Sequence, residues 1–300
     1  MSAGGFTAKH LAIVGLGLMG GSMALALRPY ADRITAVDPD PHTRDYACRV
    51  GMVDAATDDL KTGVSEADVV VLAAPVRTIL SMVRNRIGAY LRMNTLLIDI
   101  GSTKEDICNA MGALPIGIQA VGGHPMTGKE QSGCEASEAT LFQNRPFVLC
   151  PTRRTTPAAR LRALAFVEAL GAVAIEMDAH RHDRIVAAIS HLPYLLSAAL
   201  VTTVAQEAEN DDAVWALAAG GFRDMSRLAG QDVRMMGDIL STNTQAVATL
   251  LAHFRMQLAM LEAMLISRDE QKLAERLTPA RTARLAWVQR QENGRKNDGG

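Results

Sequence analysis

The spacing of its apolar runs constrains the fold of this chain more than any other feature. Short runs typical of buried strands recur through the first 177 residues, and helical stretches separate most of them. Apolar strands that alternate with helices predict βαβ units, and therefore a doubly wound, mostly parallel α/β sheet of the Rossmann type with helices on both faces. The strand-like runs are HLAIV (10–14), RITAVD (33–38), DVVVLAA (68–74), TLLIDI (95–100), GIQAVG (117–122), PFVLC (146–150) and AVAIEM (172–177), and the helical stretches are 19–27, 41–50, 76–90, 104–111 and 157–170.

The pattern changes after Met177, where almost no strand-like run occurs. Ala, Leu and Met recur instead at helical spacing, which predicts helices over 178–208 and 212–228 and one or two more over 231–268. Thr278 followed by Pro279 is a typical helix start, so we expect a last helix to begin there.

The change of pattern divides the chain into two expected domains. The first, 1–176, contains the sheet, and the second, 177–300, is all-α. The final segment ENGRKNDGG is polar, and we expect the chain to fray from about residue 292.

A stretch without any charged residue, 185–205, is long enough to cross a membrane. It also carries His191 and Pro193, and acidic and basic residues crowd its N-terminal side. A helix that is apolar all round must be buried somewhere, so we expect a helix in a protein core, with a membrane protein as the alternative.

Charge and cysteine content exclude several classes of protein. With 31 basic and 32 acidic residues, the chain has no overall field to recruit nucleic acid or an anionic membrane. The four cysteines (Cys48, Cys108, Cys134 and Cys150) lack the spacing of a metal site or a disulfide framework, and the N-terminus lacks an apolar signal core. We expect a cytoplasmic protein that binds no metal, nucleic acid or membrane.

The segment LAIVGLGLMGGS places Gly15, Gly17 and Gly20 between the first strand and the first helix. In a dinucleotide-binding fold the first glycine permits a tight turn, the second lets backbone approach a diphosphate, and the third allows close packing of helix on strand. The alternative is a glycine-rich turn with a purely structural role. The residues of this loop expected to contact the cofactor are Gly15, Leu16, Gly17, Leu18, Met19 and Gly20.

Asp38 ends the second strand at roughly the distance from the glycines that such folds require. A carboxylate there binds the ribose hydroxyls and repels a 2′-phosphate. No arginine immediately follows Asp38, so we expect NAD, with NADP less favoured. An ordinary strand-end aspartate is the alternative.

Other strand ends also carry residues suited to ligand binding. Ala74 and Pro75 follow one strand, Ser102 follows another, and His124 lies where GIQAVG gives way to GHPMTGKE. Ligands of open α/β sheets lie beyond the carboxyl ends of the strands, so these residues should line one crevice with the cofactor. His124 then has two interpretations: an ordinary loop histidine, or a group that takes a proton from a substrate.

The segments GLGLMGGS, DIGSTK, GGHPMTGKE, SHLPY and GGFRDMSRLA, in this order, resemble the prephenate and arogenate dehydrogenases of tyrosine biosynthesis from about Leu11 to Leu265. The resemblance implies an NAD(P)-binding Rossmann domain and a helical domain through which two copies dimerise. It also implies a cyclohexadienol substrate with a ring carboxylate and a pyruvyl or alanyl side chain. Hydride leaves C4 for the nicotinamide, the C4 hydroxyl loses its proton, and the carboxylate departs as carbon dioxide.

The same resemblance assigns His124 as the acceptor of the hydroxyl proton. Histidine suits this role because its ordinary pKa of about 6.5 leaves it largely neutral at cytosolic pH. Ser102 matches a serine near the C4 hydroxyl and the nicotinamide, or it caps the helix that follows. Arg227 matches the arginine that holds the ring carboxylate, for which a planar guanidinium is well shaped, or it pairs with Asp224 on a solvated helix face.

The resemblance also assigns four further residues to the substrate side. His191 matches a substrate-side histidine, although by itself a satisfied core histidine would be the better interpretation. Arg223 occupies a position where the family accepts lysine or arginine, and Glu130 either orients or gates the site or is solvated surface. Tyr194 replaces a second histidine found in many members near the substrate side chain, which bears on the choice between prephenate and arogenate.

These observations favour a homodimeric, NAD-dependent prephenate dehydrogenase that forms 4-hydroxyphenylpyruvate, with arogenate dehydrogenase as the alternative. The β-hydroxyacid dehydrogenases share the GLGxMG opening but rely on a lysine in the helical domain, and no lysine occurs between Lys129 and Lys272. A non-catalytic dinucleotide-binding protein would require neither His124 nor Arg227.

Overall fold

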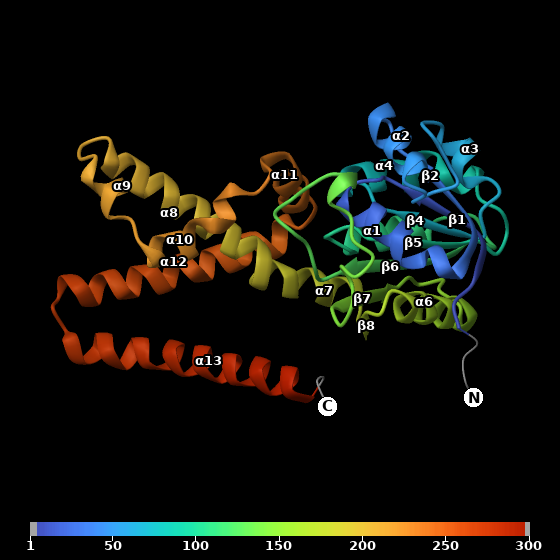
Figure 1. Cartoon of the computed structure of the whole chain (residues 1–300). Helices are drawn as coiled ribbons and strands as arrows, with labels where there is room; N and C mark the ends of the chain where they lie inside the picture. Colours follow the sequence, from blue (N-terminus) through green and yellow to red (C-terminus); the bar gives the residue numbers. More distant parts are fainter. Residues whose placement is uncertain (1–4, 298–300) are drawn as a thin grey trace. The chain divides into compact units, whose positions relative to one another are not determined.

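The computed structural model describes residues 5–297, which form one compact unit up to Val247 and a second from Ala248. The first unit is built on an eight-stranded sheet (Figure 1). The strands lie in the order β3-β2-β1-β4-β5-β6-β7-β8, and every neighbouring pair is parallel except β6 and β7. The expected fold class is therefore confirmed. The strands are β1 (Ala8–Val14), β2 (Ala31–Val37), β3 (Ala55–Thr57), β4 (Val69–Leu72), β5 (Leu96–Asp99), β6 (Gln119–Pro125), β7 (Pro146–Pro151) and β8 (Val173–Glu176).

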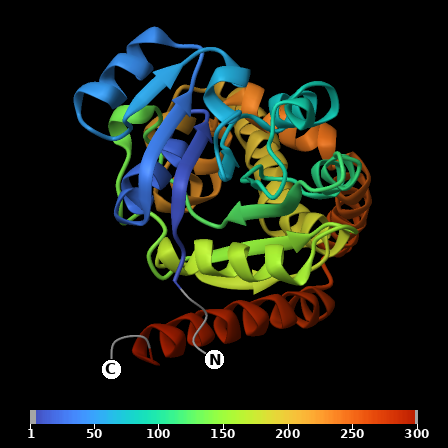
Figure 2. The same ribbon diagram turned by 90° about the vertical axis from the view of Figure 1, so that its right-hand side faces the viewer.

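Helices cover both faces of the sheet because both faces of its strands are apolar (Figure 2). Successive side chains of a strand point to opposite faces, and in β1 Ile13 belongs to one core cluster while Val14 belongs to the other. The first cluster is closed by α1 (Leu18–Leu27), α2 (Pro41–Arg49) and α6 (Pro157–Ala169), and the second by α3 (Leu60–Val64), α4 (Val76–Asn85) and α5 (Glu105–Gly112).

Several element boundaries differ from the sequence prediction. β3 and α3 were not expected, since they are short and weakly apolar. The helix expected over 76–90 ends at Asn85, and a separate 3-10 turn follows at Ile87–Ala89. His124 lies within β6 rather than in the loop beyond it, because β6 continues to Pro125 and His124 pairs with Val148 of β7.

The helix expected over 178–208 is interrupted. It begins as α7 (Ala179–Val186), passes through a π-helical turn at Ala187–His191 and continues as α8 (Leu192–Ala208). Pro193 has no N–H to bond the carbonyl four residues earlier, and Leu192 bonds Ala187 five residues back, which widens the helix at this turn.

Later helices also depart from the expected pattern. The helix predicted over 212–228 is split into α9 (Ala213–Leu217) and α10 (Gly220–Ser226), and the backbone between them is extended at Ala218 and Ala219. Two helices cover the next segment, α11 (Val233–Thr242) and α12 (Thr244–Ile266).

The last helix, α13 (Glu270–Asn297), begins earlier than predicted, and Pro279 lies inside it. The side chain of Asp269 accepts from the N–H of Lys272, whereas Thr278 donates to the carbonyl of Ala274, so Asp269 and not Thr278 caps the helix. The helix also passes the position near 292 where we expected fraying, and residues 298–300 lie outside the described part of the chain.

Two helical runs, Ala179–Ala208 and Thr244–Ile266, are long and apolar enough to cross a membrane by length and composition alone. The charge-free stretch 185–205 was expected to be a core helix, but few of its residues are buried within one chain. The described part of a single chain covers only one side of α8, whose buried residues are Tyr194, Ser197 and Ala208.

Candidate active site

The loop between β1 and α1 has the shape that a diphosphate requires. Gly15 has φ +99°, and a Cβ there would collide with the backbone carbonyl of Ala73. A Cβ at Gly20 would collide with the carbonyl of Gly15, whereas one at Gly17 would meet nothing within 4 Å. No side chain caps the first turn of α1, so its N–H groups are available to an anion. The residues present therefore fit a dinucleotide cofactor.

Asp38 is fixed beside this loop. Its Oδ2 accepts from the N–H of Leu16 at 2.7 Å, and its Oδ1 accepts from the N–H of Asp40 at 2.9 Å. Although no arginine directly follows Asp38, the guanidinium of Arg44 reaches back and donates to the carbonyls of Asp38 and Pro39 at 2.7 and 2.9 Å. The carboxylate and this guanidinium therefore lie together at the end of β2.

The loop between β5 and α5 carries Ser102 and is held on both sides. Gly101 N–H donates to Asp99 Oδ2 at 2.9 Å, and Thr103 Oγ1 lies 2.8 Å from Thr242 Oγ1 of α11. Ser102 itself is half-buried. Ala74 and Pro75, also expected to line the cofactor, lie directly before α4, for which Pro75 is the N-cap.

The alternative interpretation of Ser102 as the N-cap of α5 is wrong. The carboxylate of Asp183 from α7 caps this helix instead, because its oxygens accept from the N–H of Lys104 at 2.7 Å and of Glu105 at 2.9 Å. The hydroxyl of Ser102 is therefore not needed by the helix that follows it.

His124 has a defined hydrogen-bond partner on one side of its ring. Its Nδ1 lies 2.8 Å from Nε2 of His182, and Nδ1 of His182 lies 2.7 Å from Oδ1 of Asp183. The carboxylate of Asp183 accepts, so His182 donates through Nδ1, and the neutral form of this ring presents a lone pair at Nε2. His124 must then donate through Nδ1, and its own Nε2 carries a lone pair.

The electrostatic surroundings keep the His124 ring neutral. Burial, together with the neighbouring His182 and Lys104, holds the pKa of His124 well below its ordinary value. The arrangement can therefore accept a proton at Nε2, and it uses a histidine–histidine–carboxylate chain to fix the tautomer.

A buried ion pair lies beneath the strand ends. Lys104 and Asp99 are both 0% exposed, and Nζ of Lys104 bonds Asp99 Oδ2 and, at 2.7 Å, the carbonyl of Gly123. Burial raises the pKa of Asp99, and the ammonium of Lys104 opposes this rise. The pair ties the residue before His124 to the loop that carries Ser102.

His191 ends the π-helical turn and is buried beside Asn243. Its Nδ1 lies 3.2 Å from Nδ2 of Asn243, and the same Nδ2 donates to the backbone carbonyl of Asp183 at 2.7 Å. Burial lowers the pKa of His191 to about 4, so this ring is also neutral.

The other expected substrate-side residues do not join the hydrogen-bond network of the histidines. Tyr194 is only 9% exposed and packs in the cluster that contains Met236 and Ile239 of α11. Within residues 5–297, no hydrogen bond or ion pair joins the three remaining residues to His124 or His191, and all are exposed: Glu130, Arg223 and Arg227. The alternative pairing of Arg227 with Asp224 is not among the ion pairs of this part of the chain.

Sequence reasoning missed the residues that organise the histidines. His182 and Asp183 lie in the charged segment HRHDR, and Asn243 lies between two helices. His182 and Asp183 are adjacent and bond each other, but their other partners and those of Asn243 are 52 to 79 residues away in the chain, as with Asp183 and Lys104 or Asn243 and His191. Only the polar residues crowded before the charge-free stretch gave any signal.

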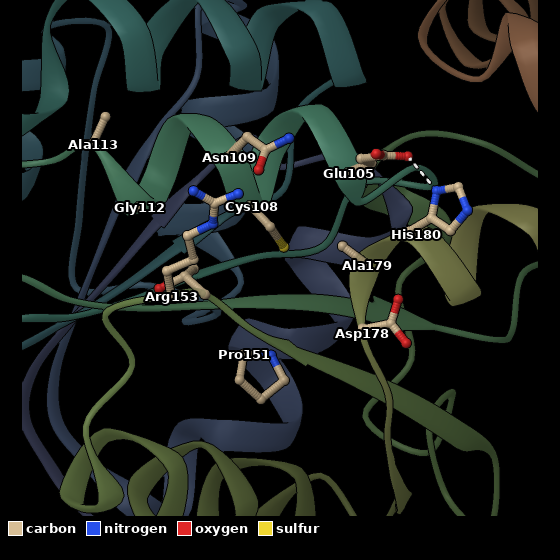
Figure 3. Close-up of a pocket in the computed structure, with 11 residues that line it drawn as sticks. Glu105, Cys108, Asn109, Gly112, Ala113, Pro151, Arg153, Asp178, Ala179 and His180 are labelled. Atoms are coloured by element: carbon tan, nitrogen blue, oxygen red, sulfur yellow. Dashed lines mark hydrogen bonds and ion pairs between the residues drawn. The ribbon is translucent and has the colours of Figure 1, made fainter.

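A pocket of about 690 Å³ lies apart from these groups, beside α5 and the start of α7. Figure 3 shows Glu105 facing His180 across its edge, with a distance of 3.1 Å between Oε2 and Nδ1. Arg153 and Asp178 also line it, whereas His124, Ser102 and Arg227 do not. We therefore place the candidate site at the strand ends and not in this pocket.

The chain is similar to known proteins along most of its length. Residues 23–176 match the family described as "Prephenate dehydrogenase, nucleotide-binding domain", and residues 178–279 match "Prephenate dehydrogenase, dimerization domain". The cyclohexadienyl dehydrogenase of Zymomonas mobilis is 34% identical over 282 residues, which cover 93% of this chain and 96% of that protein. The prephenate dehydrogenase of Bacillus subtilis is 34% identical over 238 residues, covering 78% of this chain and 64% of that protein.

Solved structures share the fold across both parts of the chain. The prephenate dehydrogenase of Aquifex aeolicus, in complex with hydroxyphenyl propionate and NAD+, has a TM-score of 0.84 and 29% identity, covering 92% of this chain and 97% of the other. The arogenate dehydrogenase of Synechocystis has a TM-score of 0.80 and 29% identity, covering 93% and 99%.

Proposed function

Because the chain belongs to the prephenate dehydrogenase family, we propose that it catalyses the NAD-dependent oxidative decarboxylation of prephenate to 4-hydroxyphenylpyruvate. One observation carries the proposal most directly: the imidazole of His124, held at Nδ1 by His182, lies at the same sheet edge as a loop shaped for a dinucleotide. The reaction needs both groups, because the C4 carbon loses a hydride while its hydroxyl loses a proton.

The cofactor is held by residues at three strand ends. The glycine loop and the first turn of α1 bind the diphosphate, Asp38 binds the ribose hydroxyls, and Ala74 with Pro75 lines the nicotinamide side. When bound, NAD supplies the oxidant that takes the hydride from C4. The A. aeolicus relative was solved with NAD+, which supports this choice of cofactor.

The substrate is held and deprotonated by side chains from the sheet and from the helices that follow it. His124 accepts the C4 hydroxyl proton at Nε2, and Ser102 donates to the same oxygen. Arg227 binds the ring carboxylate until the bond from C1 to that carboxylate breaks and its electron pair completes the aromatic ring. Glu130 and Arg223 contribute to the charge at the mouth of the site.

Arogenate is the second candidate substrate. The Zymomonas relative is named a cyclohexadienyl dehydrogenase, and the Synechocystis relative is an arogenate dehydrogenase. The two substrates differ only in a keto or amino group on the side chain. Tyr194 is buried against α11, so it shapes this end of the site by its volume rather than by a charge.

We further propose that the enzyme is a cytoplasmic homodimer that associates through its helical domain, 177–300. The match to a dimerization domain supports this assembly. Apolar side chains such as Val233 and Met235 of α11 and Met256 and Leu258 of α12 are exposed on a single chain, and a second copy would cover them. All four cysteines are free, which is typical of a reducing compartment.

The function is tested by steady-state rates on the full-length enzyme with prephenate and arogenate, each with NAD and with NADP. We expect the highest kcat/KM for prephenate with NAD. A higher value for arogenate would replace the substrate assignment, and no turnover of either compound would refute the proposed activity.

A further inference from the structure

His191 and Asn243 make a contact that the proposed reaction does not by itself require. His191 is 2% exposed and Asn243 is 7% exposed, so the contact is sealed from bulk water. One amide nitrogen, Nδ2 of Asn243, faces two groups: the carbonyl oxygen of Asp183 at 2.7 Å and Nδ1 of His191 at 3.2 Å. These two neighbours determine how the amide is oriented.

The orientation of the amide follows from the carbonyl of Asp183. A backbone carbonyl only accepts, so the atom that faces it must be the NH₂ group of Asn243 and not its oxygen. The flipped amide would place two oxygen atoms 2.7 Å apart in a buried position, which is costly. The same NH₂ group therefore also faces His191, whose Nδ1 must present a lone pair.

The tautomer of His191 follows in turn. A neutral imidazole with a lone pair at Nδ1 carries its proton at Nε2. In the described part of the chain no group bonds this Nε2, yet no buried polar side-chain atom there is left without a partner. The Nε2 of His191 must therefore reach accessible space, where it can donate to a ligand.

We infer that Asn243 is a positioning residue that holds His191 as a neutral Nε2–H donor, and that this donor binds an oxygen atom of the substrate. The second half of the inference rests on the proposed function, and the first half does not. Asp183 would then set both histidines: its side chain, through His182, makes His124 an acceptor at Nε2, and its backbone carbonyl, through Asn243, makes His191 a donor.

The two histidines would thus have opposite tautomers that match their tasks. A proton acceptor needs a bare Nε2, whereas a group that binds a substrate carboxylate or keto oxygen needs a proton there. The titratable groups that face His191 are Asp183 and His182 of α7, and His191 in turn acts on His124 of β6. A neutral donor also leaves the proton acceptor undisturbed, because it adds no positive charge beside it.

The tautomer is measured by ¹⁵N NMR of the full-length protein labelled at histidine. The signals of His191 are identified as those lost in His191→Gln. We expect Nε2 to be protonated and Nδ1 to be unprotonated at neutral pH. A protonated Nδ1 overturns the inference, and this result does not depend on which substrate the enzyme uses.

The substrate contact is measured with Asn243→Asp, which has nearly the same shape but can only accept. The new carboxylate is repelled by the carbonyl of Asp183 and turns toward His191, where it draws the proton to Nδ1 and leaves Nε2 as an acceptor. We expect the KM for prephenate to rise about tenfold or more, with a smaller change in kcat. Because the carboxylate also raises the pKa of His191, the KM should fall again as pH decreases and Nε2 regains its proton.

Asn210→Asp is the matched control, since it adds the same charge at an exposed asparagine whose amide bonds only Gln206 within the described structure. It should leave the KM unchanged. An unchanged KM in Asn243→Asp, or an equal rise in both variants, overturns the substrate contact. If Asn243→Asp does not fold, the NMR result on the wild-type protein still tests the tautomer inferred for His191. An enzyme that turns over neither prephenate nor arogenate refutes the proposed function while the NMR result stands.

Discussion

His124 and His182 share a hydrogen bond of 2.8 Å between Nδ1 and Nε2, and their rings meet edge to face with centroids 5.0 Å apart. His182 is in turn held by Asp183 at 2.7 Å. These two hydrogen bonds fix the direction of each proton from the Asp183 carboxylate to His124. The proposed base therefore already carries its lone pair at Nε2 before any substrate arrives.

Replacing His182 should weaken catalysis without weakening substrate binding. His182→Leu removes the acceptor for Nδ1–H of His124, so the ring can adopt the wrong tautomer or rotate. We expect kcat to fall about 10–10²-fold with little change in KM. His180→Leu, on the same helix at an exposed position, is the control and should retain wild-type kcat. Equal kcat values for the two variants would show that His182 does not orient His124.

Replacing the base itself should have the larger effect. His124→Asn keeps a polar side chain in β6 but cannot accept the hydroxyl proton. We expect kcat to fall about 10²–10⁴-fold while substrate affinity changes little. Affinity can be measured by equilibrium binding of a substrate analogue in the presence of NAD. Full turnover by this variant would remove His124 from the mechanism.

Arg227→Ala should act mainly on substrate binding. The guanidinium has no ion-pair partner in residues 5–297, so its loss leaves no unpaired carboxylate in the protein. We expect KM to rise about 10–10²-fold, the value of a charge-assisted contact, with Arg227→Lys recovering part of the loss. Arg223→Ala should raise KM less. The assignment fails if KM is the same in Arg227→Ala and the wild type.

Asp38→Asn should shift the cofactor preference. The amide removes the negative charge that repels a 2′-phosphate, while Arg44 remains nearby to receive it. We expect the ratio of kcat/KM for NADP to that for NAD to rise roughly tenfold or more. An unchanged ratio would mean that Asp38 does not face the ribose.

The fall of kcat/KM on the acid side should occur at an unusually low pH. Protonation of His124 abolishes its function as a base, and its pKa lies well below the ordinary value of about 6.5 because of burial and the neighbouring His182 and Lys104. Activity should therefore be retained as pH falls through 6.5 and be lost only below it. A limb centred at or above about 6.5 would contradict the neutral ring that the geometry implies.

Several features of the fold follow from local chemistry and could be predicted. Alternating apolar strands and helices fix the sheet, because each strand needs both faces covered. Gly15, Gly17 and Gly20 predict the diphosphate loop, since a side chain at Gly15 or Gly20 would collide with backbone. The start of α13 was not predictable in the same way. Asp269 and the Thr278–Pro279 pair are both typical of a helix N-terminus, and the sequence alone does not show which of them begins the helix.

The sequence by itself determined the sheet and the phosphate loop, because these depend on residue type and on spacing within a few dozen residues. Through its resemblance to a known family it also predicted His124 as the base. Only the tertiary structure decided which groups surround that base. His182, Asp183, Lys104 and Asn243 each form at least one hydrogen bond to a partner far away in the chain, and the histidine tautomers and buried charges are defined only once those partners meet. A hydrogen bond requires a direction and a distance of about 3 Å, and neither exists until the chain has folded.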